Sequence, residues 1–202
     1  MRTVRHWNAR YVRDRLSVMA FERRHPDAPW LTPLMFTILT SWLKPGDRGL
    51  EWGSGRSTTW LAERVSQLTS VENDGAWYER IKLKLHEKGL TNVDYCLRND
   101  ESDYLCISNQ IEHESLDFCL VDGIARDLCT LASIPLLKGG GILIIDNCNW
   151  YLPCRSNSPN SRRESDGAAS EAWSLFLDRV KGWRYVWTTS GVFDTGLWLK
   201  PM

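Results

Sequence analysis

Short apolar segments alternate with helical patterns from residue 48 to residue 146, and this alternation constrains the fold more than any other feature of the chain. Strand patterns occupy residues 48–52, 68–72, 92–97, 116–122 and 141–146. Helical patterns occupy residues 57–65, 75–88, 100–108, 125–137 and 168–180. This order predicts a parallel sheet with helices on both faces. Residues 183–189 and 195–200 predict a closing antiparallel hairpin, which completes a doubly wound, mostly parallel α/β sheet of seven strands.

Two further segments flank this alternating region. Residues 3–24 and 32–43 have helical spacing, so we expect residues 1–45 to form a helical extension of a single domain that spans residues 1–202. Residues 148–167 are polar and rich in Ser, Asn, Arg and Pro. Because a long loop that follows a strand end is often a lid, we interpret residues 148–167 as a lid or substrate loop.

Composition narrows the functional class. The 202 residues carry 25 basic and 25 acidic side chains, and a net charge of zero disfavours a protein that binds mainly nucleic acid. No apolar run approaches the roughly 18–20 residues that span a bilayer, so no membrane partner is expected. The start of the chain lacks the apolar core of a secretory signal, and six cysteines without CxxC spacing suit a reducing cytoplasm.

The predicted strand ends carry acidic and small residues. Glu51-Trp-Gly53-Ser-Gly55-Arg-Ser57-Thr58 follows the first strand, and Glu72 ends the second. Asn99-Asp100, Asp122-Gly123 and Asp146-Asn147 follow the next three strands. Ligands of such sheets bind beyond the carboxyl ends of the strands, where a carboxylate can accept both hydrogen bonds of a ribose diol. Thr58 replaces the third glycine of a dinucleotide motif and no P-loop lysine is present, so the pattern favours a nucleoside ligand without a pyrophosphate.

The sequence here resembles the class I S-adenosylmethionine (SAM)-dependent methyltransferases, whose Rossmann-like fold ends in a similar hairpin. Glu51-x-Gly53-x-Gly55 is similar to their first motif, and Leu-Leu-Lys-Gly-Gly-Gly-Ile-Leu-Ile-Ile-Asp146 to their stretch through strand five. The resemblance implies that Glu51 and Gly53 lie near the methionine end of SAM, that Glu72 binds the ribose and that Asp100 binds the adenine amine. The implied cofactor-binding positions are Glu51, Gly53, Ser54, Gly55, Ser57, Glu72, Asn73, Asp100 and Asp122. Ser57 departs from the third glycine of many members, and Asp100 could instead cap the following helix.

A narrower resemblance concerns the catechol-type O-methyltransferases, which bind a metal ion. Asp122 with Asp146-Asn147 is similar to their Asp, Asp-Asn ligand set and implies a Mg²⁺ ion held by Asp122, Asp146 and Asn147. Asp122 and Asp146 would then also be catalytic, because the metal lowers the pKa of the acceptor hydroxyl. The alternative is that Asp122 contacts the cofactor region while Asp146 and Asn147 cap a loop.

These observations predict a cytoplasmic enzyme that transfers a methyl group from SAM to a small molecule at oxygen. Arg155, Arg162 and Arg163 are candidates to bind an acidic group of the acceptor. Three alternatives stay open: a nicotinamide-dependent oxidoreductase, a non-catalytic nucleoside- or partner-binding protein, and a nucleic-acid methyltransferase that uses the arginine-rich first helix. An apolar helix face near Trp7 and Tyr11 could support a homodimer.

Overall fold

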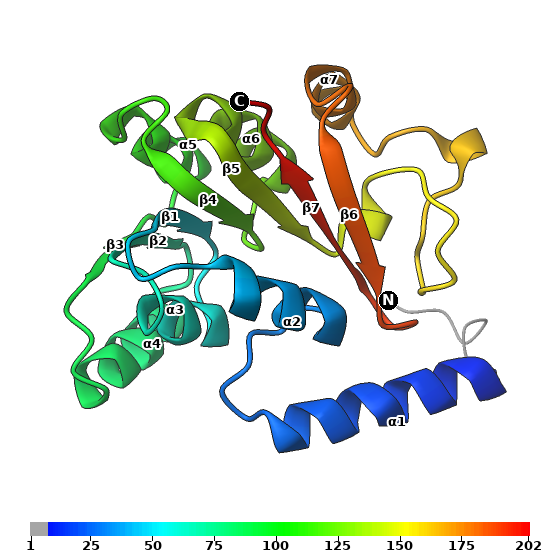
Figure 1. The fold of residues 1–202 in the computed structure, drawn as a ribbon, viewed down its shortest axis with the longest axis horizontal. Helices are drawn as coiled ribbons and strands as arrows, with labels where there is room; N and C mark the ends of the chain where they lie inside the picture. Colours follow the sequence, from blue (N-terminus) through cyan, green and yellow to red (C-terminus); the bar gives the residue numbers. More distant parts are fainter. Residues whose placement is uncertain (1–7) are drawn as a thin grey trace.

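The computed structural model describes residues 8–202 and has a seven-stranded sheet at its centre (Figure 1). The helices are α1 (Ala9–Arg24), α2 (Pro33–Trp42), α3 (Arg56–Ala62), α4 (Gly75–Glu87), α5 (Glu101–Cys106), α6 (Arg126–Ser133) and α7 (Glu171–Arg179). The strands are β1 (Arg48–Trp52), β2 (Gln67–Glu72), β3 (Val93–Leu97), β4 (Leu116–Val121), β5 (Leu137–Asp146), β6 (Arg184–Thr189) and β7 (Asp194–Leu199). Four short 3₁₀ turns are η2 (Ile107–Gln110), η3 (Ile134–Leu136), η4 (Cys148–Trp150) and η5 (Glu164–Asp166).

The strand order is β3-β2-β1-β4-β5-β7-β6. Strands β1 to β5 pair in parallel, and β7 runs antiparallel between β5 and β6. This topology confirms the predicted mostly parallel sheet with a closing hairpin. The strand order reverses between β1 and β4, and in such sheets that position is where ligands bind.

Two apolar layers cover the faces of the sheet, as the two-residue period of the strands requires. In β4, Cys119 and Val121 face a layer that includes α5, α6 and α7, whereas Phe118 and Leu120 face α2 and α3. Figure 1 shows these two groups of helices on opposite sides of the sheet. The central strands are therefore buried on both faces, which explains why their sequences are continuous apolar runs.

The boundary between α6 and β5 differs from the sequence prediction. A helix over residues 125–137 and a strand from residue 141 were expected, but α6 ends at Ser133 and β5 begins at Leu137. Pro135 lacks the amide hydrogen that would continue the helix, and it lies instead in η3. Glycines 139–141 then carry an irregular stretch of β5 where its register with β4 shifts.

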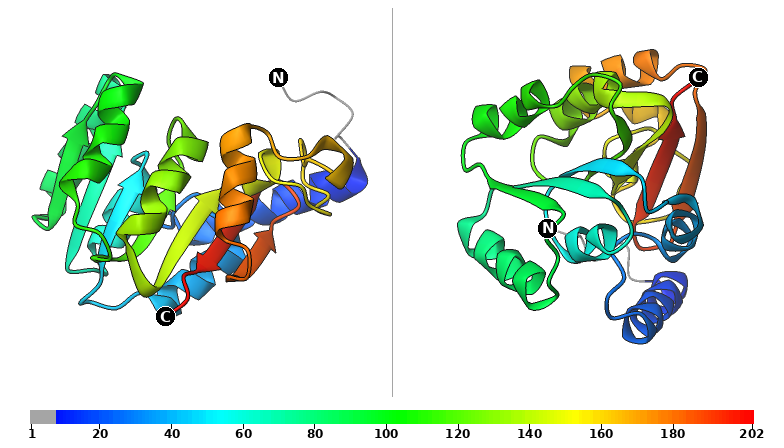
Figure 2. Two further views of the ribbon diagram at one scale, coloured as in Figure 1. Left: turned by 90° about the horizontal axis from the view of Figure 1, so that it is seen from above. Right: turned by 60° about the vertical axis from the view of Figure 1, so that its left-hand side comes forward.

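The first described helix lies at the edge of the molecule. Asn8 caps α1 by accepting the amide hydrogen of Tyr11. The predicted helical positions 3–7, including Trp7, lie outside the described residues. Tyr11 and Val18 pack against Val192 in the turn between β6 and β7. The right-hand view of Figure 2 shows α1 at the margin of the molecule. None of the helices in residues 8–202 is long and apolar enough to cross a membrane.

Candidate active site

The glycine turn after β1 touches the turn after β4. Gly53 has a φ of +92°, and a Cβ atom built on it would lie 2.5 Å from the backbone nitrogen of Gly123. Only glycine fits this left-handed position and this close approach. The contact brings the first predicted motif to the point where the strand order reverses.

Glu51 is fully buried beneath this turn. Its Oε2 atom accepts hydrogen bonds from the hydroxyls of Thr58 and Ser70, each at 2.6 Å. Its Oε1 atom is buried without a hydrogen-bond partner among the described residues. Burial raises the pKa of Glu51 to about 7, although the neighbouring hydroxyls of Ser57, Ser70 and Thr58 lower it. The predicted cofactor residues Glu51 and Ser57 thus lie together, and one Glu51 oxygen is an unsatisfied acceptor among the described residues.

Thr58 has a role in this turn that the sequence analysis did not assign. Its hydroxyl accepts the amide hydrogen of Gly55 at 2.9 Å and donates to Glu51. The residue that breaks the dinucleotide motif therefore connects the glycine turn to the buried carboxyl. The signal was present in the sequence as a hydroxyl three residues after Gly55, a position typical of a helix start.

Glu72 is surrounded by hydrogen-bond donors at the end of β2. Its Oε2 accepts from the amide and the hydroxyl of Ser54 at 3.1 and 2.6 Å, and its Oε1 accepts from the amides of Asn73 and Asp74 at 2.8 and 2.9 Å. The Ser54 hydroxyl also meets the Tyr95 hydroxyl at 2.7 Å. The structure therefore brings together Ser54, Glu72 and Asn73, as the resemblance implies, and adds Tyr95 from the neighbouring strand.

Two tryptophans contact residues of the glycine turn. The indole of Trp77 donates to the Ser54 carbonyl at 2.8 Å and stacks on Trp30, with ring centroids 6.3 Å apart. The guanidinium of Arg56 lies 5.0 Å from the centre of the Trp30 ring. These contacts hold Ser54 and Arg56 of the turn against the two rings.

Asp100 lies at the exposed start of α5. Its carboxylate accepts the amide hydrogens of Ser102 and Asp103 at 2.9 and 3.3 Å, which is a helix cap. The hydrogen bond from Ser102 lowers the pKa of Asp100 below its usual value. The capping alternative thus describes its contacts, while its adenine-binding role stays a prediction. Asn99 does reach the end of β2, because its side-chain amide donates to the Asn73 carbonyl at 3.2 Å.

Arg126 binds the carboxylate of Asp122 and the backbone of Asp146, two of the predicted metal ligands. Its guanidinium binds the Asp122 carboxylate at 2.6 Å, the Asp122 and Asp146 carbonyls at 2.7 Å each, and the Gly123 carbonyl at 3.0 Å. A side chain with permanent positive charge opposes a divalent cation at the same position. Within residues 8–202 no group of three or more His, Cys, Asp or Glu side chains could hold a metal ion. The Arg126 guanidinium thus binds the carboxylate of Asp122, one of the three predicted ligands, and the predicted Mg²⁺ ion stays a prediction.

The carboxyl of Asp146 belongs to a chain of buried threonines instead. Thr195 donates its hydroxyl to Asp146 Oδ1 at 2.7 Å and accepts the amide hydrogen of Thr32 at 3.2 Å. The hydroxyls of Thr32 and Thr188 are also hydrogen-bonded, and Thr188 donates to the Thr195 carbonyl at 2.9 Å. Burial raises the pKa of Asp146 well above its usual range, and the nearby charge of Asp122 adds to this effect.

Asp122, Asp146 and Asn147 line one cavity of about 470 Å³, which we call the edge cavity. Asn147 has a φ of +52° and precedes η4, so it turns the chain away from β5. Arg15, Arg56, Trp30, Trp150 and Phe193 complete most of the wall. The first helix and the start of the segment 148–167 thus both reach this cavity.

The predicted arginine contacts of the 148–167 segment are not found at this cavity. Arg162 and Arg163 bind backbone carbonyls of their own segment, those of Gly167 and Asp166 and those of Cys154 and Ser156. Arg155 lines a different cavity. The cations at the edge cavity are Arg15 and Arg56, which the sequence analysis did not connect with the acceptor because they lie far apart in the chain.

Comparison with solved structures places this geometry in a known fold. The O-methyltransferase TomG from Streptomyces achromogenes, solved in complex with SAM, matches with a TM-score of 0.63 and 19% identity over 97% of this chain and 91% of that one. The chain has the methyltransferase fold. A putative caffeoyl-CoA O-methyltransferase from Staphylococcus aureus matches this fold with a TM-score of 0.61 and 14% identity over 97% and 94% of the two chains.

The methyltransferase fold also includes proteins that are named for other reactions. The [4+2]-cyclase SpnF matches with a TM-score of 0.55 and 14% identity over 84% of this chain and 81% of that one. No protein-family model matches the sequence, and no curated protein matches it significantly. The likeness therefore shows the fold, and the function has to be argued from the site.

Proposed function

We propose that this protein transfers a methyl group from SAM to a hydroxyl group of a small molecule. The observation that carries the proposal is the arrangement at the reversal of strand order. There the Gly53 turn contacts the backbone of Asp122, and Asp122 lines the edge cavity together with Asp146. Glu51 is buried beneath the same turn, and Glu72 accepts hydrogen bonds from its Ser54. Such a site offers acceptors for a nucleoside and an adjacent space for a second substrate.

The residues present fit SAM at two places. The partnerless Oε1 of Glu51 is an acceptor close to the glycine turn, where an ammonium group can be bound. Glu72 suits a ribose diol, but the Ser54 hydroxyl already occupies one of its acceptor positions. We therefore propose that ribose binding replaces the bond between Ser54 and Glu72, and that Asp122 and Asp100 lie at the border of this site.

Bound SAM would supply a methyl group on a sulfonium, a leaving group that needs no protonation. This chain's own residues then have to align the acceptor and accept its proton. One Asp146 oxygen is engaged by Thr195, and we assign the other as the proton acceptor of the attacking hydroxyl. Arg126 holds the Asp122 carboxylate and the backbone beside Asp146 in place, so the proposal includes no metal ion.

The edge cavity favours an acceptor with a flat ring, because Trp30, Trp150 and Phe193 offer apolar surface. The charged groups of its wall have both signs, since Arg15 and Arg56 lie there with the carboxylates of Glu22, Asp122 and Asp146. The proposal also includes a cytoplasmic location and a small acceptor. These two parts are supported by the sequence analysis alone.

Calorimetric titration with SAM and with its demethylated product tests the proposal. We expect both to bind wild-type protein. We further expect the Ser54→Ala variant to bind SAM about two- to five-fold more tightly, because the ribose no longer displaces a hydrogen bond worth about 0.5–1 kcal/mol.

Ser174→Ala, which removes an exposed hydroxyl on α7, is the matched control and should leave the affinity unchanged. Absence of heat with either ligand would overturn the proposal. Binding of a reduced nicotinamide dinucleotide in their place would favour the oxidoreductase. Binding of SAM with no turnover of any acceptor would favour a non-catalytic role.

A further inference from the structure

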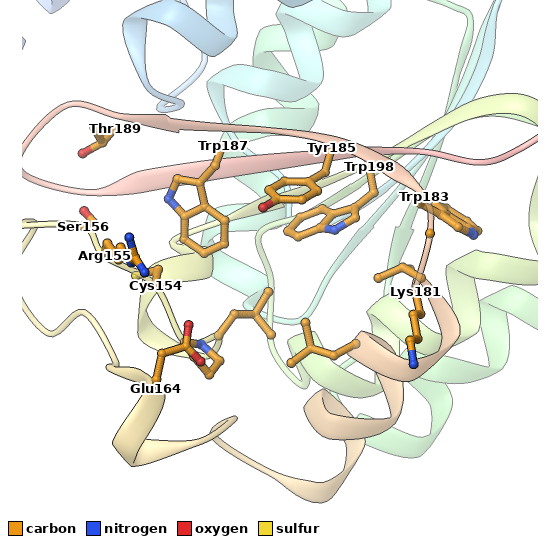
Figure 3. A pocket seen from close by; sticks show the side chains of 15 residues that line it. Cys154, Arg155, Ser156, Glu164, Lys181, Trp183, Tyr185, Trp187, Thr189 and Trp198 are labelled. Atoms are coloured by element: carbon orange, nitrogen blue, oxygen red, sulfur yellow. The ribbon is translucent and has the colours of Figure 1, made fainter.

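A second cavity, of about 650 Å³, lies on the other face of the β6–β7 hairpin, and we call it the aromatic groove. Its floor is formed by Trp183, Tyr185 and Trp187 from β6 and the residue before it, together with Trp198 from β7. Figure 3 shows these four rings along one side of the groove. The end of α7 and residues 152–156 form the opposite wall.

The rings form a row and not a cage. Trp183, Tyr185 and Trp187 alternate along one strand, so their side chains point to the same face of the sheet. Tyr185 lies opposite Trp198 on β7, and the two rings are within 21° of parallel at 6.2 Å. A site for an organic cation surrounds its ligand with converging ring faces, whereas these rings lie in one row along the groove. Tyr185 is exposed, Trp183 and Trp187 are half-buried, and Trp198 is buried beneath them.

Tyr185 is the most accessible part of this surface. Its exposed fraction is 63%, although aromatic side chains usually bury most of their area. Trp187 is held more firmly, because its indole donates to Asp194 at 2.8 Å. A ligand would therefore find a rigid floor with one large ring free to contact it.

The rim of the groove carries charges of both signs. Arg155, Glu164 and Lys181 line it, and none of their side chains forms an ion pair or hydrogen bond within residues 8–202. In Figure 3, Arg155 and Glu164 lie near one end and Lys181 near the other. The Glu164 carboxylate would repel an anionic polymer. An apolar ligand would form no hydrogen bond or ion pair with any of the three groups. A polyhydroxylated ligand can donate to Glu164 and accept from Arg155 and Lys181.

We propose that the aromatic groove binds an oligosaccharide. The apolar C–H faces of successive sugar rings would pack on Tyr185 and its neighbouring indoles, while the sugar hydroxyls would bind the charged rim. This site is separate from the edge cavity and does not depend on the methyl-transfer proposal.

An array of immobilised neutral oligosaccharides, probed with the full chain, tests the proposal. We expect retention of a defined set of glycans. Tyr185→Ala should weaken binding at least ten-fold, and Tyr185→Trp, which keeps a large flat ring, should preserve it. Val186→Ala is the matched control, because Val186 is exposed on the same strand but points to the opposite face.

Three outcomes would overturn the proposal. The first is no glycan retained above background. The second is retention that Tyr185→Ala leaves unchanged, which would place the glycan elsewhere. The third is Tyr185-dependent binding of a ten-residue polyproline peptide or a dT15 oligonucleotide with no binding of glycans. Thermal unfolding of each variant shows that its fold is intact, and exposed Tyr185 can be replaced without opening the core.

Discussion

Glu51 is a buried carboxyl group whose protonation differs from that of a glutamate in water. It lies within the core, it receives two hydroxyl hydrogen bonds, and its Oε1 atom has no partner among residues 8–202. The protonated form is favoured there because a buried charge is costly. The presence of glutamate at the end of a buried strand could be read from the sequence, but its burial under the glycine turn could not.

This burial makes the stability of the protein depend on pH. The pKa of Glu51 rises from 4.5 to about 7 on folding, so the folded chain binds more protons than the unfolded chain between these values. The free energy of unfolding should therefore fall as pH rises from about 4.5 to about 7. Glu51→Gln imitates the protonated form and should remove about 3 kcal/mol of this dependence. Urea unfolding at pH 5 and pH 8 measures it, and equal pH dependence in both proteins would contradict this assignment.

At the scale of elements, one side chain connects the carboxyl ends of two neighbouring strands. Arg126 begins α6 and connects the carboxyl ends of β4 and β5 through four hydrogen bonds. It binds Asp122, one of the residues that the sequence analysis assigned as metal ligands. The arginine was visible four residues after Asp122, but spacing cannot show that a guanidinium folds back between two strand ends.

Removing this connection should be costly. Arg126→Ala leaves the Asp122 carboxylate and three carbonyls without their partner, and we expect a loss of about 3–5 kcal/mol of unfolding free energy. Arg179→Ala, at the exposed end of α7, should change stability by less than about 0.5 kcal/mol. Urea unfolding compares the two variants. Millimolar Mg²⁺ should leave the wild-type melting temperature unchanged, and a clear rise would argue for the metal site.

The sequence predicted elements better than it predicted their boundaries and contacts. The sheet was predicted from apolar strand segments that alternate with helices, because a parallel sheet covered on both faces needs continuous apolar strands. The end of the helix before Pro135 was predicted too late, because the helical pattern continued to residue 137 whereas α6 ends at Ser133. The resemblance implied Ser54, Glu72 and Asn73 as cofactor-binding positions, and they lie together because they follow adjacent strands. Tyr95 and Arg15 were missed, since only the folded chain brings them to the site.

At the scale of the whole molecule, the first and last parts of the chain meet at Asp146. Thr195→Val removes the hydrogen bond to Asp146 Oδ1 and the acceptor of the Thr32 amide without changing side-chain volume greatly. Because two buried polar groups lose their partner, we expect a loss of about 2–3 kcal/mol. Thr37→Val, on the exposed face of α2, is the control. Equal stability of the two variants by urea unfolding would show that the threonine chain contributes nothing.

The position of β7 has a consequence for the order in which the protein is made. This strand lies inside the sheet, between β5 and β6, yet it is the last of the seven to leave the ribosome. Asp146 and Thr32 are synthesised long before Thr195 joins them. Until β7 is synthesised, the nascent chain has an unpaired edge at β5 and an incomplete site. We expect it to depend most on chaperones during this interval.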